Sequence, residues 1–137
     1  IVGFGEACRY LRENVQEEMK HCLALKTMLE RKIEAEIPGT TVNGSLSPRL
    51  ANTSNIAFHG MSAVEMVMEL DKRGFAVSSG SACHSGEVHV SRTLTAMGIE
   101  KNVALSSLRI SLGPDNNEED VNRFVVAIEE LCKERAN

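Results

Sequence analysis

The residue types best suited to covalent chemistry lie in one short segment, 77–86, which reads "VSSGSACHSG". Cys83 stands near its middle. Its neighbours are small or polar: Ser79, Gly80, Ser81, Ala82, His84 and Ser85. Because such side chains bury little apolar surface, we expect an exposed, mobile loop. An accessible thiol with a lowered pKa is a good nucleophile, and a neighbouring imidazole is compatible with this. The segment predicts either a catalytic loop with Cys83 as nucleophile or a surface loop with an incidental cysteine.

A metal site is a weaker alternative for the same segment. Cys83, His84 and His89 are close in sequence and carry ligand atoms that zinc accepts. No second cysteine stands at a CxxC spacing. We therefore predict no metal site.

Arg109 is the second candidate for chemistry. It lies in "LSSLRISLG" (105–113), where alternation predicts a strand with Leu108 and Ile110 on one face and Arg109 on the other. A guanidinium fixed on a strand can hold a carboxylate through two hydrogen bonds. The alternative is an edge-strand arginine in solvent.

The elements that must position these residues start with a long helix. Apolar residues recur every three or four positions from Phe4 to Ile37, which predicts one helical face that includes Cys8, Leu11 and Cys22. Pro38 and Gly39 follow and end the helix. We expect so long a helix to pack partly against something outside these residues.

The rest of the chain alternates between short strands and helices. We predict strands at 40–43, 52–58, 75–79 and 105–113, and helices at 62–74, 91–98 and 117–136. Ser62 with Glu65 fits a capping box for the first of these helices, and Asn116 with Glu119 a similar pair for the last. The order predicts an α+β fold, a small sheet of three to four strands with helices mainly on one face, in one domain over 1–137.

Composition narrows the classes of function. The net charge is −4, the pI about 5.6, and the chain has no Trp and one Tyr, which argues against a nucleic-acid partner. No apolar run is long enough to span a bilayer. The start lacks a Met and the features of a signal peptide, so we expect a piece of a longer, intracellular protein. Cys8, Cys22 and Cys132 occupy core-like helical positions, and we expect reduced thiols.

Taken together, "SSGSAC", "HSG", "LTAMGI" and "SSLRISLG" resemble the C-terminal part of the pyridoxal-phosphate-dependent cysteine desulfurases. The group that is similar has a long catalytic loop and includes selenocysteine lyases. "IVGFGEAC" also looks like the helix that leads out of the large domain of these enzymes, and "VNGS" like their first small-domain strand. The resemblance covers nearly the whole chain and implies the small domain of a fold-type I enzyme.

The resemblance also implies roles for particular residues. Cys83 matches the nucleophile that takes sulfur from L-cysteine, or selenium from L-selenocysteine, leaving L-alanine and a persulfide. Arg109 matches the arginine that binds the substrate carboxylate. The expected partners are the amino acid, a sulfur acceptor protein and a second subunit that completes a homodimer through the large domain.

Some positions depart from the pattern of these enzymes. Pro114 stands where arginine is frequent, His84 follows Cys83 where threonine is frequent, and His89-Val90 replaces a Glu-Pro pair. The His-Lys pair that carries the cofactor lysine is missing, so we expect the isolated chain to fold without binding pyridoxal phosphate. Two other readings stay open at this point: a separate sulfur-carrier module without activity, and a pyridoxal-phosphate enzyme with another reaction, for which the loop cysteine has no use.

Overall fold

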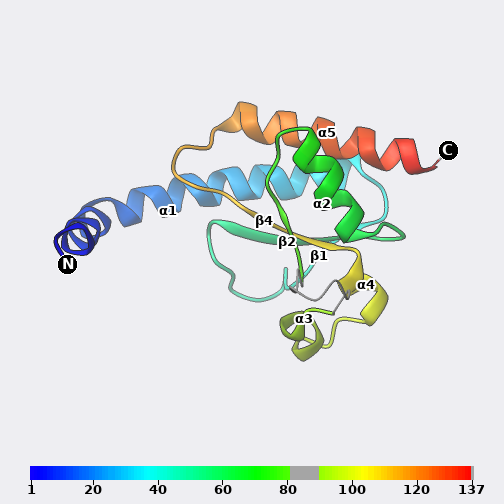
Figure 1. The fold of residues 1–137 in the computed structure, drawn as a ribbon, viewed down its shortest axis with the longest axis horizontal. Helices are drawn as coiled ribbons and strands as arrows, with labels where there is room; N and C mark the ends of the chain where they lie inside the picture. The colour runs from blue at the N-terminus through cyan, green and yellow to red at the C-terminus, as the bar shows by residue number, and fades with distance from the viewer. Residues whose placement is uncertain (81–89, 137) are drawn as a thin grey trace.

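A computed structural model describes residues 1–80 and 90–136, in which a four-stranded antiparallel sheet carries helices on one face (Figure 1). The strands lie in the spatial order β1 (Thr40–Val42), β2 (Thr53–Phe58), β4 (Ser107–Ser111) and β3 (Ser78–Ser79). The helices are α1 (Val2–Glu36), α2 (Ala63–Lys72), α3 (Arg92–Ala96), α4 (Lys101–Leu105) and α5 (Glu118–Ala136). The expected α+β class is confirmed.

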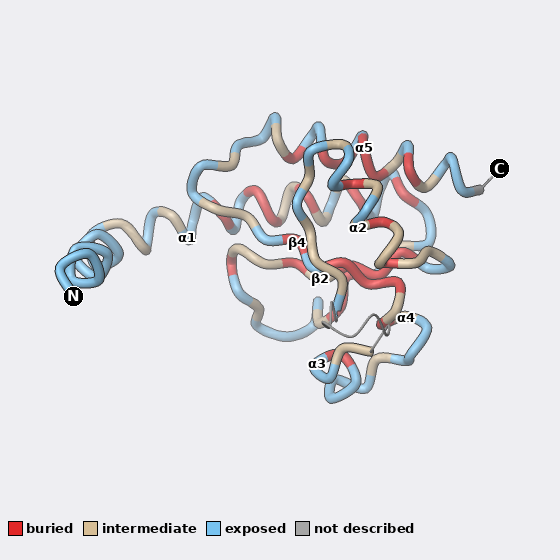
Figure 2. Tube along the Cα trace, viewed as in Figure 1, coloured by how far each residue is buried: buried red, intermediate tan, exposed pale blue. Residues whose placement is uncertain are grey.

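One face of the sheet forms the core. Ile56 of β2 lies opposite Leu108 of β4, and both side chains are fully buried, as are Leu29 and Ile33 on α1. Burying one such side chain stabilises the fold by about 1.5–3 kcal/mol. Figure 2 shows the buried residues gathered where the second half of α1, the helix α5 and the sheet meet. The helices α1 and α2 contact the strands directly, and α5 packs on both helices.

The first half of α1 projects beyond this core and is mostly exposed, with only Asn14, Val15 and Glu18 half-buried (Figures 1 and 2). The helix is confirmed, but the core-like position predicted for Cys8 is wrong, because its side chain is exposed, as are those of Phe4 and Leu11 on the same helical face. Burial along α1 begins at Cys22. Helical periodicity predicts that an apolar face exists and does not say what covers it.

The predicted capping box at the start of α2 is not formed. Ser62 is the N-cap residue, but its side chain accepts no capping hydrogen bond. The carboxylate of Glu65 pairs instead with the guanidinium of Arg135 on α5. A contact between helices has replaced the local one.

The cap of α5 forms one residue later than predicted. The Oδ1 atom of Asn117 accepts a hydrogen bond from the amide of Asp120 at 3.1 Å, and Oδ2 of Asp120 accepts one from the amide of Asn117 at 3.2 Å. Asn116, the predicted cap, uses its Oδ1 to accept from the amide of Gly113 at 2.8 Å. Asn116 therefore closes the turn before the helix, and Glu119 is not its partner.

All four strands are shorter than predicted, and two of them are shorter by several residues. The strand expected at 75–79 pairs only at Ser78 and Ser79, because Phe75 and Val77 pack against the core from an irregular segment. The strand expected at 105–113 starts at Ser107, since Leu105 belongs to α4, a helix that the sequence did not predict.

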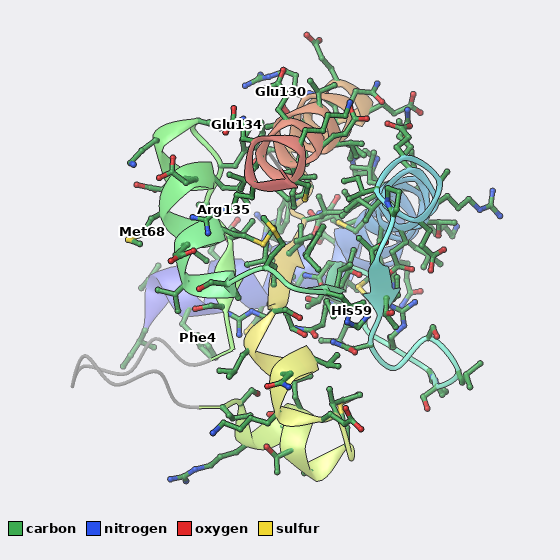
Figure 3. The ribbon with its side chains drawn as sticks, turned by 90° about the vertical axis from the view of Figure 1, so that its right-hand side faces the viewer. Phe4, His59, Met68, Glu130, Glu134 and Arg135 are labelled. Atoms are coloured by element: carbon green, nitrogen blue, oxygen red, sulfur yellow. The ribbon has the colours of Figure 1, made fainter. Side chains whose placement is uncertain are left out.

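Ion pairs fasten α2 to α5. Arg73, the C-cap residue of α2, donates to the carboxylates of Glu130 at 3.2 Å and Glu134 at 2.8 Å, and to the carbonyl of Ala127 at 3.2 Å. Figure 3 shows Glu134 and Arg135 on the stretch of α5 that lies beside α2. The glutamates of these pairs are exposed, so each pair contributes little.

A better-buried pair holds the loop between β1 and β2 against α1. Arg49 donates to both carboxylate oxygens of Glu30, at 2.6 and 2.9 Å, and the hydroxyl of Ser54 donates to the same carboxylate at 2.6 Å. Burial raises the pKa of Glu30, but the hydrogen bonds and charge of Arg49 outweigh it, so the pKa of this carboxyl lies below its ordinary value. Lys26 adds a hydrogen bond to the carbonyl of Leu50 at 2.6 Å.

Replacing Glu30 by glutamine is expected to lower the free energy of unfolding by about 1–2 kcal/mol at pH 7, because the charge-assisted bonds become neutral ones. A carboxyl whose pKa is lowered by folding stabilises the fold above its unfolded pKa of about 4.3. That stability is lost as the pH falls through the folded-state pKa. The difference between parent and variant should therefore be full above about pH 5 and shrink below it.

Urea unfolding of the chain at several pH values measures this difference. Glu13→Gln, an exposed glutamate on the same helix, is the matched control and should change stability by less than about 0.5 kcal/mol. A Glu30→Gln deficit that stays constant down to pH 3 would contradict the assignment of the charge.

Candidate active site on the open face of the sheet

Arg109 lies on the face of the sheet opposite the core. Leu108 and Ile110, its neighbours in β4, are buried beneath the helices, while the Arg109 side chain is exposed. The predicted strand and orientation of Arg109 are both confirmed. On this second face of the sheet, the exposed Arg109 side chain is accessible to a ligand.

A row of polar residues crosses the sheet at the level of Arg109. The register places Arg109 opposite Asn55 of β2 on one side and Ser78 of β3 on the other. Asn43 follows β1, and its backbone N–H donates to the backbone carbonyl of Asn55 at 2.8 Å. The row therefore reads Asn43, Asn55, Arg109, Ser78, with side chains on one face, since directly paired residues point the same way.

Hydrogen bonds fix both ends of this row. At one end, Nδ2 of Asn43 donates to Oδ1 of Asn55 at 2.7 Å and to the hydroxyl of Ser107 at 3.0 Å. The hydroxyl of Ser107 donates in turn to the carbonyl of Val103 in α4 at 2.6 Å. At the other end, Nη2 of Arg109 donates to the hydroxyl of Ser78 at 3.2 Å.

The guanidinium of Arg109 has N–H donors that are available to a ligand. Over residues 1–80 and 90–136, its one hydrogen bond through the side chain is the bond to Ser78, and no carboxylate there forms an ion pair with it. A guanidinium has five N–H donors in a planar fork. The site can therefore bind an anionic ligand, and a carboxylate matches the fork best.

The strand β3 leads from this row into the segment that carries Cys83. Ser78 and Ser79 pair with Arg109 and Leu108, and Gly80 follows at once. The next described residue beyond the gap, Val90, precedes Ser91, whose hydroxyl caps α3 by accepting from the amide of Leu94 at 3.4 Å. Of the predicted loop residues, Ser79 thus pairs with Leu108, directly after the Ser78 that pairs with Arg109, and Gly80 follows Ser79. The others lie outside the described residues: Ser81, Ala82, Cys83, His84 and Ser85.

The two ends of that segment touch each other. A Cβ atom added to Gly80 would lie 2.8 Å from the Cβ atom of Ser91, closer than real side chains approach. Glycine at position 80 therefore allows β3 and the first turn of α3 to pack together. The described chain therefore stops and resumes at one place, two residues after Ser78, the residue that pairs with Arg109.

The other three thiols are poorly placed for chemistry. Burial raises the pKa of both Cys22 and Cys132, which disfavours the reactive thiolate. Cys8 is exposed on the projecting half of α1. In the part of the chain that the structure describes, no three His, Cys, Asp or Glu side chains are grouped so that they could hold a metal ion.

The residues of this chain do not fit pyridoxal phosphate by themselves. The cofactor needs a lysine at the site to hold it as a Schiff base. The six lysines are Lys20, Lys26, Lys32, Lys72, Lys101 and Lys133. All six belong to helices, and none lies in a strand or in the polar row.

No helix in the described ranges is long and apolar enough to cross a membrane.

Sequence reasoning found Arg109 but missed Asn43, Asn55 and Ser78. Alternation in 53–58 does place Asn55 on the face away from Ile56. That Asn55 stands beside Arg109 depends on the register between strands far apart in sequence, which no local pattern reveals.

Comparison with known proteins supports one family. Residues 1–124 match the family described as aminotransferase class-V. The chain is 37% identical to cysteine desulfurase IscS of Clostridium botulinum over 98% of this chain and 34% of the relative. It is 34% identical to a cysteine desulfurase of Nostoc sp. over 97% of this chain and 33% of that protein.

A solved structure agrees with the sequence matches. The NifS-like protein of Rickettsia africae superposes with a TM-score of 0.82 and 31% identity, over 94% of this chain and 33% of that one. The chain therefore spans about a third of the length of the curated relatives it matches.

Proposed function

The chain belongs to the aminotransferase class-V family, and from this premise we propose that it is the small C-terminal domain of a cysteine desulfurase. One observation carries the proposal. The strand that leads to Cys83 pairs with the strand of Arg109, so a carboxylate-binding arginine and the entry to a cysteine loop lie side by side. An enzyme that moves sulfur from an amino acid onto its own cysteine needs both.

Arg109 is proposed to hold the carboxylate of L-cysteine. Its guanidinium is exposed, faces away from the core and is steadied by Ser78. A fork of N–H donors fixes both the position and the orientation of a planar carboxylate. The substrate thiol would then project from a fixed point, which is what attack by a second thiol requires.

Cys83 is proposed as the nucleophile. Five residues of extended chain span at most about 18 Å, so Cys83 cannot lie farther than that from Ser78. Its sulfur forms a bond to the sulfur of L-cysteine as the carbon–sulfur bond of the substrate breaks. The electron pair of that bond stays with the carbon, which takes up a proton and becomes the methyl group of L-alanine, while Cys83 carries a persulfide. No outside oxidant is needed, because the carbon is reduced as the transferred sulfur is oxidised.

Pyridoxal phosphate, which the family and its desulfurase members imply for the full-length enzyme, would supply an electron sink for the breaking carbon–sulfur bond. We assign the lysine that holds it to residues outside this chain. The proposal also includes L-selenocysteine as a second substrate, a protein that accepts the persulfide sulfur, and a homodimer formed through those other residues.

The test is to measure products from L-cysteine with the full-length enzyme and with residues 1–137 alone. We expect the full-length enzyme, loaded with pyridoxal phosphate, to yield L-alanine and, with a reductant, sulfide in equal amounts. We expect the isolated chain to retain no cofactor after dialysis and to yield neither product. Pyruvate and ammonia in place of L-alanine would show an elimination reaction and would overturn the assignment as a desulfurase. L-Selenocysteine is assayed in parallel.

A further inference from the structure

Asn55 presents an unused hydrogen-bond donor beside Arg109. The two residues are directly opposite each other in β2 and β4. Side chains in such pairs have Cβ atoms about 4.5–5.5 Å apart. In the described part of the chain, Oδ1 of Asn55 accepts from Asn43, while its Nδ2 makes no hydrogen bond.

The chain of hydrogen bonds determines which way the Asn55 amide points. Ser107 has one hydroxyl proton, and it goes to the carbonyl of Val103. The Ser107 oxygen must therefore accept, so the Asn43 atom that meets it is the NH₂ group. The same NH₂ group meets Asn55, whose facing atom must then be the oxygen. The amide nitrogen of Asn55 is thereby turned away from Asn43, an orientation that buried groups hold in place.

Burial makes this arrangement rigid. Asn43 is 5% exposed and Ser107 is fully buried, so neither can exchange its partner for water freely. Asn55 itself is only half-buried, at the border of the open face. A ligand held by Arg109 reaches that border.

Resting on the proposed function, we propose that Nδ2 of Asn55 donates a further hydrogen bond to the substrate carboxylate, beside those of Arg109, and selects for it. A carboxylate only accepts hydrogen bonds and has room for donors beyond those of Arg109. A carboxamide at the same place would turn an NH₂ group toward either Asn55 or Arg109, where donor would face donor. A site whose polar groups hydrogen-bond one ligand rejects analogues of that ligand that leave those polar groups unpaired.

The test uses the full-length enzyme loaded with pyridoxal phosphate. The measured quantities are the KM for L-cysteine and the inhibition constant of L-cysteinamide, with the unfolding temperature as a check on folding. Asn55→Ala is expected to raise the KM for L-cysteine about tenfold, the loss of one bond to a charged group. The inhibition constant of L-cysteinamide should stay within about twofold. Thr53→Ala, on the same face of β2 two residues away, is the control and should change neither.

Asn55→Asp keeps the test valid if Asn55→Ala does not fold. The aspartate has the same size and still accepts from Asn43, but it offers the substrate an anion in place of a donor. It should raise the KM for L-cysteine about a hundredfold, with less effect on L-cysteinamide. An equal change for both compounds, or an unchanged KM, would show that Asn55 has a structural role only.

Arg109→Ala separates this inference from the proposed function. One outcome is that Arg109→Ala weakens the binding of L-cysteine more than that of L-cysteinamide, while the Asn55 variants do not distinguish the two compounds. The inference about Asn55 then fails and the proposed function stands. If Arg109→Ala also fails to distinguish the two compounds, the carboxylate site itself is wrong, and both fall.

Discussion

Replacing Cys83 by serine in the full-length enzyme is expected to lower sulfide release from L-cysteine by at least about a thousandfold. A hydroxyl group cannot form the sulfur–sulfur bond that the proposed reaction requires, although serine is close to cysteine in size. The KM should change little, because the proposed contacts to the carboxylate come from Arg109 and Asn55. Sulfide and L-alanine formation are measured together, since the proposed reaction links them.

The other cysteines provide the control for this experiment. Cys8→Ser changes an exposed thiol near the start of α1 and is expected to keep full activity. Selenide release from L-selenocysteine adds a second readout. Its loss in Cys83→Ser would show that one nucleophile serves both substrates, and its survival would show that selenium leaves without help from the thiol. Undiminished sulfide release would refute the assignment of Cys83.

The second large effect is a difference in stability between substitutions on the two faces of β4. Leu108→Ala is expected to lower the free energy of unfolding by about 2–5 kcal/mol, because Leu108 is fully buried against Ile56 and leaves a cavity in the core. The next residue, Arg109, is exposed, and Arg109→Ala should cost less than about 1 kcal/mol of stability. Urea unfolding of the chain measures both values.

Catalysis should show the reverse order. Arg109→Ala removes charge-assisted bonds worth about 2–4 kcal/mol, which corresponds to a loss of about 30- to 1000-fold in kcat/KM for L-cysteine. Leu108→Ala should reduce activity in proportion to the enzyme that remains folded. If Arg109→Ala unfolds the chain as readily as Leu108→Ala does, the arginine serves the fold and not the substrate.

Patterns along the chain predicted the elements whose signal is local. The spacing of apolar residues predicted α1 and α5, a capping pair and a final glycine predicted α2, and alternation predicted the inward face of β4. The cap of α5 was wrong by one residue, because Asn116 and Asn117 offer similar side chains and only the turn at Gly113 decides between them. The short helix α4 has too few residues to show a period.

What could not be predicted depends on contacts between distant segments. Glu65 could not be seen to pair with Arg135, nor Asn55 to stand beside Arg109, until the strands and helices had been placed. Arg109 itself was found because its flanking residues are apolar and its orientation follows from alternation alone. The exposure of Cys8 was missed because an apolar helical face does not reveal its partner.

The order of the strands also bears on how the chain folds. The two central strands, β2 and β4, are neighbours in space, yet residues 59–106 separate them in the chain. Most of the loop-closure entropy must be lost before their pairing gives any stability in return. Proteins with such long-range pairings fold slowly for their size. During synthesis, α1, β1 and β2 leave the ribosome well before β4 exists to cover them. β2 and β4 can pair, and Arg109 can lie beside Asn55, only after residue 111 has emerged.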